Sequence, residues 1–124
     1  MHYYPHTDEK QRSLAAIIDV LNDIDHQLQE LERISRGSGR IAPFLAQDVA
    51  RIIEQFFFNC QLAEERMKNG FTRRYVTRKQ VDDLNLQLAN SVCRMRELSG
   101  KSAIVARVLQ DKFGAGPAGT APDR

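Results

Sequence analysis

The chain has 124 residues, of which 42% are hydrophobic and 27% charged, so it is long enough for one domain with a real core but too short for a second catalytic domain. This composition excludes a disordered chain, and the absence of a long apolar run or a secretion signal points to a cytoplasmic protein without a membrane partner. The net charge of +2 is too small for a dedicated, strongly cationic nucleic-acid binder.

The first predicted element is a helix over residues 8–35, preceded by a flexible N-terminus, 1–7. Thr7 or Asp8 would supply its N-cap, and the glycines of RGSGR, 36–40, would end it. Its apolar residues alternate at spacings of three and four, which places them on one stripe: Leu14, Ile17, Leu21, Ile24, Leu28 and Leu31.

A second helix is predicted over 43–68, with Pro43 in its first turn and Asn69-Gly70 as its end. Thr77 and Gln80 have the spacing of a capping box and predict a third helix over 78–98. At Gly100 this helix either kinks or gives way to a short fourth helix, 102–113, and the tail 114–124 should be disordered.

These elements predict an all-α fold, an antiparallel three-helix bundle of long amphipathic helices with a possible short fourth helix after Gly100. The regular apolar seams would also suit a coiled coil with another chain, although packing within the molecule is the favoured use. Cys60 and Cys93 lie in apolar helical patterns and are expected to be reduced and buried. The Asp23-x-x-His26 pair has no second such pair to complete a dinuclear site, so we expect no metal and no cofactor.

Three consecutive phenylalanines, 56–58, provide the clearest candidate for an interface. Successive helical residues are about 100° apart, so these three rings cannot share one buried stripe. Phe56 belongs with the core pattern, whereas Phe58 has polar helical neighbours. The candidate partner interface is therefore Phe57, Phe58 and Leu62, unless the helix lies centrally and buries a wide arc.

The connector between the second and third helices is strongly basic. Residues 66–79 contain no acid, whereas residues 1–34 are rich in acids. Cations in the first turn of a helix oppose its dipole, so stability alone does not explain Arg78 and Lys79. The partner of this connector is phosphate, another protein or the acidic first helix of the same chain. The candidate anion or nucleic-acid patch is Arg73, Arg74, Tyr75, Arg78 and Lys79, with Tyr75 available to stack on a base.

Residues 18–33, IDVLNDIDHQLQELER, resemble the first helix of the all-helical chorismate mutases. The resemblance implies an enzyme in which arginines and a lysine surround a dicarboxylate. Where that family has an arginine, six residues before the Ile24-Asp25 pair, this chain has Ile18. The arginines that would have to gather instead are Arg12, Arg36, Arg40 and Arg51.

The residues contain no arrangement typical of nucleophilic or acid–base catalysis, so we expect no enzymatic activity and no small-molecule substrate. The favoured function is a small helical protein–protein interaction module that self-associates or binds another helical protein. The alternative is a nucleic-acid-binding accessory protein that uses the basic connector 73–79, and a chorismate-mutase-like enzyme is a remote third hypothesis.

Overall fold

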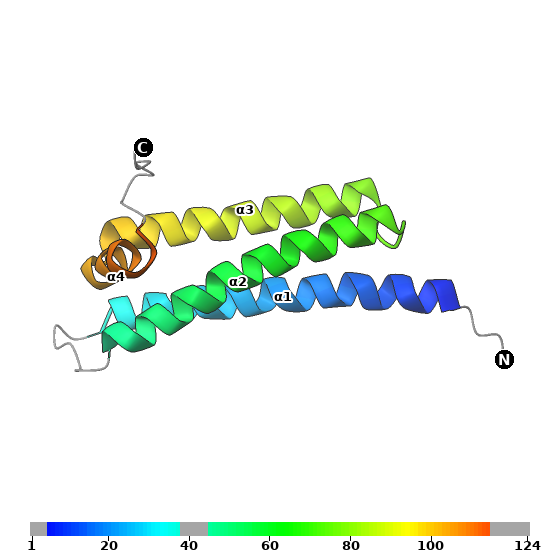
Figure 1. Ribbon diagram of the computed structural model, residues 1–124. Coiled ribbons are helices and arrows are strands. Elements are labelled where there is room, and N and C mark those ends of the chain that lie inside the picture. Colours follow the sequence, from blue (N-terminus) through cyan, green and yellow to red (C-terminus); the bar gives the residue numbers. More distant parts are fainter. Residues whose placement is uncertain (1–4, 38–44, 115–124) are drawn as a thin grey trace.

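The structure is a computed structural model that describes residues 5–37 and 45–114, and every regular element in these ranges is an α-helix. The helices are α1 (Pro5–Ser35), α2 (Leu45–Thr72), α3 (Arg78–Lys101) and α4 (Ala103–Phe113). Figure 1 shows the three long helices lying lengthwise beside one another, with α4 at the end where α3 finishes. The predicted all-α class is confirmed. The predicted helix start at Pro43, the first four residues and the tail from 115 onward lie outside the described residues.

One hydrophobic core joins all four helices. The apolar stripe of α1 forms its longest continuous part, because Ile17, Ile24, Leu28 and Leu31 are fully buried. Helix α1 packs most extensively against α2. Helix α3 makes fewer contacts with α1 and with α2, and α4 packs mainly against α2 and α3. The largest fully buried side chain of the core is Phe56 of α2.

Helix α1 begins earlier than its sequence signals suggest. It starts at Pro5, so Thr7 and Asp8 lie inside the helix and the prediction of an N-cap at either residue is wrong. Proline is compatible with the first turn of a helix, where an intrahelical N–H bond is not required. Asp8 stands in the first turn, where a negative charge favours the helix dipole, and it forms an ion pair with Arg12 one turn later.

Helix α2 continues through Asn69-Gly70 to Thr72, so the prediction that these two residues end it is wrong. Gly70 is buried, and a Cβ atom built on it would lie 3.0 Å from Ser13 Oγ and 3.1 Å from Val76 Cγ2. The glycine therefore permits a close approach rather than a helix stop. The chain turns after Thr72, where Arg74 adopts the left-handed region with φ of 62°.

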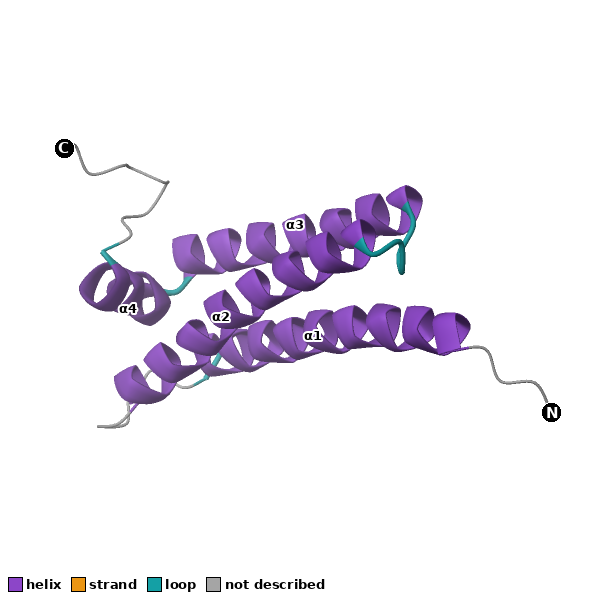
Figure 2. Cartoon of the chain, turned by 45° about the vertical axis from the view of Figure 1, so that its right-hand side comes forward, coloured by secondary structure: helices purple, strands orange, loops and turns teal. Residues whose placement is uncertain are grey.

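The predicted capping box at the start of α3 is confirmed. Thr77 Oγ1 accepts from the Gln80 backbone N–H at 3.1 Å, and Gln80 Oε1 accepts from the Thr77 backbone N–H at 2.8 Å. At the C-terminal end of α3, the sequence left open whether the helix kinks at Gly100 or gives way to a fourth helix. In the structure α3 ends and α4 begins at Ser102. Ser102 ends α3 through its backbone N–H and caps α4 with its side chain. Figure 2 shows the short loop that separates the two helices.

Candidate interaction surface and basic connector

The three phenylalanines of α2 have different environments. Phe56 is 1% exposed, as predicted for a core residue. Phe57 is 41% exposed, and its ring contacts Phe56 and Phe113 edge to face, with ring centroids 5.6 Å and 5.4 Å apart. Phe57 therefore helps to hold α4 against α2, and only part of its ring remains available to a partner.

Phe58 is 63% exposed, the highest value of any aromatic side chain among the described residues. The core side of α2 is defined by Val49, Ile53, Phe56, Ala63 and Met67, and helical geometry places Phe58 opposite that side. Leu62, one turn after Phe58, is only partly exposed and packs against the core cluster. The three predicted interface residues thus contribute unequally, and Phe58 is the one that points fully outward.

Charged and amide side chains surround Phe58 on the same side of α2. We call this surface the outer face of α2, and it consists of Arg51, Glu54, Gln55, Phe58, Gln61, Leu62 and Glu65. All of these except Leu62 are exposed. Arg51 forms an ion pair with Asp48 on the same helix, and both side chains remain at least half exposed. The outer face is therefore one large aromatic ring surrounded by polar and charged side chains, and aromatic side chains are enriched at protein interfaces.

The basic connector is held to the rest of the molecule by its middle. The backbone N–H groups of Tyr75 and Val76 both donate to the Gly70 carbonyl, at 2.7 Å and 3.2 Å. Val76 is buried in the core, and the Tyr75 hydroxyl donates to Glu9 of α1. That hydrogen bond raises the pKa of the Tyr75 phenol. Tyr75 thus contacts the acidic first helix, one of the three partners left open by the sequence.

Acidic side chains lie near several of the connector cations. Arg78 approaches Asp82 at 4.0 Å, and Lys79 approaches Asp83 at 3.5 Å, one turn further along α3 in each case. These pairs are highly exposed and worth little, but they reduce the local positive charge. Arg73 lines a shallow depression together with Tyr75 and Glu9, beside Arg12, Ser13 and Asn69. The spacing of Asp82 and Asp83 was visible in the sequence, whereas the approach of Glu9 depends on the fold.

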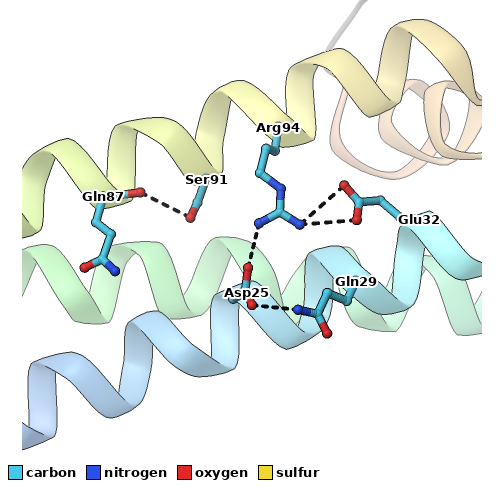
Figure 3. Close-up of polar contacts among 6 residues, drawn as sticks. All are labelled: Asp25, Gln29, Glu32, Gln87, Ser91 and Arg94. Atoms are coloured by element: carbon cyan, nitrogen blue, oxygen red, sulfur yellow. Dashed lines mark hydrogen bonds and ion pairs between the residues drawn. The ribbon is translucent and has the colours of Figure 1, made fainter.

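An ionic cluster that the sequence did not predict joins α3 to α1. Figure 3 shows Arg94 of α3 pointing toward two carboxylates of α1. Its Nη1 donates to Asp25 Oδ1 at 2.6 Å, and its Nη2 donates to Glu32 Oε1 at 3.2 Å. Gln29 Nε2 donates to the other oxygen of Asp25 at 2.8 Å. The hydrogen bond to Asp25, followed by that to Glu32, raises the pKa of the Arg94 guanidinium.

The two cysteines differ from one another. Cys60 is half-buried, and burial together with the nearby Glu64 carboxylate raises the pKa of its thiol to about 11. Cys93 is exposed, so the prediction that both thiols are buried is wrong for Cys93. In α3 the core residues are Leu84, Leu88, Met95 and Leu98, and Cys93 falls on the opposite side of the helix.

Of the arginines considered for a chorismate-mutase-like site, the described part of the chain holds Arg12 near the start of α1 and Arg51 near the start of α2, which are far apart. Arg12 of α1 pairs with Asp8, and Arg51 of α2 pairs with Asp48. Arg36 is exposed just after α1, and Arg40 lies outside the described residues. The beginning of α1 and the beginning of α2 lie at opposite ends of the molecule in Figure 1.

Comparisons of the chain with models of protein families, with curated proteins and with solved structures find no significant match. Within residues 5–37 and 45–114, no helix is long and apolar enough to cross a membrane.

Proposed function

We propose that this protein is a small helical protein–protein interaction module, without intrinsic catalysis, that self-associates through the outer face of α2. The observation that carries the proposal is the exposure of Phe58, a large aromatic side chain that projects from the side of α2 opposite the core. Aromatic residues at the centre of a polar rim supply much of the binding energy at protein interfaces.

We also infer that the helices form an antiparallel three-helix bundle closed at one end by α4. The support is the short connector between α2 and α3, the packing of α1 on α2, and the contacts that α4 makes with both α2 and α3. In this arrangement the outer face of α2 belongs to a helix whose other side is fixed in the core. A partner would therefore meet a rigid surface, which reduces the entropy lost on binding.

The nucleic-acid alternative is supported less well. Asp82 and Asp83 lie near Arg78 and Lys79, and Glu9 accepts the hydrogen bond of Tyr75, the residue proposed to stack on a base. Phosphate binding depends on uncompensated cations, and each of these acids would repel phosphate.

The proposal is tested by sedimentation velocity over a series of protein concentrations, with the wild type and Phe58→Glu. We expect the wild type to form a species larger than the monomer, and Phe58→Glu to remain monomeric. Leu86→Glu is a matched control, because Leu86 of α3 is 64% exposed, nearly the same as Phe58, and should leave association unchanged. A wild type that stays monomeric, or a Phe58→Glu variant that associates like the wild type, would overturn the proposal.

The same samples distinguish the nucleic-acid alternative when generic duplex DNA is added at low and high salt. Phosphate contacts predict an affinity for DNA that falls steeply with salt, whereas association centred on an aromatic ring changes little. Binding to DNA that is lost in Arg73→Ser/Arg74→Ser and unaffected by Phe58→Glu would favour the alternative.

A further inference from the structure

Two of the three charges on the outer face of α2, Arg51 and Glu65, lie equally far from Phe58 on opposite sides and have opposite signs. Arg51 lies seven residues before Phe58 and Glu65 lies seven residues after it. Seven residues are close to two full helical turns, so these three side chains share one stripe, with each charge roughly 10 Å from the ring along the helix axis. Both Arg51 and Glu65 are exposed.

We propose, on the basis of the proposed self-association, that the outer face of α2 pairs with the same face of a second copy, with the two helices antiparallel about a two-fold axis at Phe58. In this pairing the two Phe58 rings meet at the axis. Arg51 of each copy then faces Glu65 of the other, because positions equally far before and after the axis lie opposite each other. The charge pair thus occurs twice.

Charge complementarity selects this orientation. A parallel pairing in the same register would set Arg51 against Arg51 and Glu65 against Glu65, and like charges across an interface are unfavourable. The antiparallel pairing brings opposite charges together instead. It also places Glu54, four residues before the axis, near Gln61, three residues after it, where the amide can donate to the carboxylate.

The extent of the surface determines the strength of the dimer. The stripe from Arg51 to Glu65 is roughly 20 Å long, and a single helix pair of this length buries less area than a stable, permanent dimer requires. The pairing is therefore weak and reversible. Phe58 supplies most of the affinity, while Arg51 and Glu65 fix the direction and register of the second copy.

A charge-swap series measured by sedimentation equilibrium tests the arrangement. Arg51→Glu and Glu65→Arg each turn two attractive pairs into repulsive ones, and each should weaken dimerisation by about tenfold. The double variant keeps the net charge of the wild type and should restore most of the affinity. Glu64→Arg, an exposed charge reversal next to Glu65 but on another side of the helix, should have little effect.

Disulfide trapping gives a second readout that does not depend on charge. In a Cys60→Ser/Cys93→Ser background that keeps Phe58, chains with Glu54→Cys are mixed with chains with Gln61→Cys, both at exposed positions. Mild oxidation should link one chain of each kind, whereas neither variant alone should be linked. Leu86→Cys in the same background serves as the control, because its position is exposed and lies on α3. Circular dichroism of each variant would show that it remains folded.

The outcomes separate this arrangement from the proposed function. If Phe58→Glu abolishes dimers, but the double charge swap does not recover the affinity lost in the single charge reversals and the Glu54→Cys and Gln61→Cys chains do not link to each other, the self-association stands and the antiparallel register is overturned. If the wild type is monomeric at every concentration, both are overturned. We expect the double charge swap to restore the affinity and a Glu54→Cys chain to link to a Gln61→Cys chain.

Discussion

Replacement of Gly70 by alanine tests the close approach between α2, α1 and the basic connector. Gly70 has a helical backbone, so alanine gains at most about 1 kcal/mol of helix propensity there. Against this gain, the new Cβ would lie 3.0 Å from Ser13 Oγ and 3.1 Å from Val76 Cγ2, both closer than ordinary van der Waals contact. The serine hydroxyl can rotate away. The valine cannot, since it is buried and its backbone N–H is bonded to the Gly70 carbonyl.

Overpacking of this kind typically costs about 1–3 kcal/mol, so we expect Gly70→Ala to destabilise the fold by about 1 kcal/mol after the propensity gain is included. Urea unfolding followed by circular dichroism at 222 nm measures this change as a lower midpoint with the same slope. Gly100→Ala is the matched control, because Gly100 is also helical and no atom lies within 4 Å of its added Cβ. This control should be neutral or stabilising.

A double-mutant cycle with Val76→Ala identifies the cause. Removal of the two valine methyl groups frees the space that the new Cβ needs, so the double variant should be more stable than the sum of the single changes predicts, by about 1 kcal/mol. If Gly70→Ala stabilises the protein, or if the two changes are additive, the close approach to Val76 is not the reason for the glycine.

Three further changes probe other contacts in the structure. Arg94→Met should cost about 1 kcal/mol, because it removes a partly buried cation that bridges two carboxylates, and urea midpoints should show a smaller loss at 1 M salt than at low salt. Ser102→Ala should cost about 1 kcal/mol through loss of the α4 cap, whereas Ser102→Thr keeps the hydroxyl and should retain most of the stability; an equal loss would contradict the capping role. At pH 8 a thiol reagent should modify Cys93 rapidly and Cys60 only on unfolding. Since the pKa of Cys60 is about 11 in the fold and 9.0 ordinarily, stability should fall as the pH rises from 9 to 11, and Cys60→Ala should lessen that fall.

The helices were predictable because their signals are local. The three-four seam of α1 and the Thr77–Gln80 capping box each involve residues within a few turns of one another, and the structure has both. Asn69-Gly70 failed as a stop signal for the opposite reason. Whether a glycine ends a helix or admits a neighbour depends on what packs against it, and here the neighbours come from α1 and from beyond the turn.

The ionic cluster of Arg94 could not be predicted from sequence. Its partners Asp25 and Glu32 are 69 and 62 residues away along the chain, and the sequence contains many other acids on α1 that would have matched equally well. The cluster requires the relative rotation of α1 and α3, which no local pattern encodes. The same holds for the hydrogen bond from Tyr75 to Glu9, which changes the environment of the basic connector.

The outer face of α2 could be predicted only in part. Helical geometry alone placed Phe58 away from Phe56, but only the packing of the other helices decides whether a second surface covers it. In the structure Phe113 of α4 reaches Phe57, whereas Phe58 stays 63% exposed. Because Phe58 is exposed and belongs neither to the core cluster nor to the residues packed against it, its substitution changes the surface and leaves the core residues in place. Loss of association in Phe58→Glu at unchanged unfolding free energy would therefore report on the interface itself.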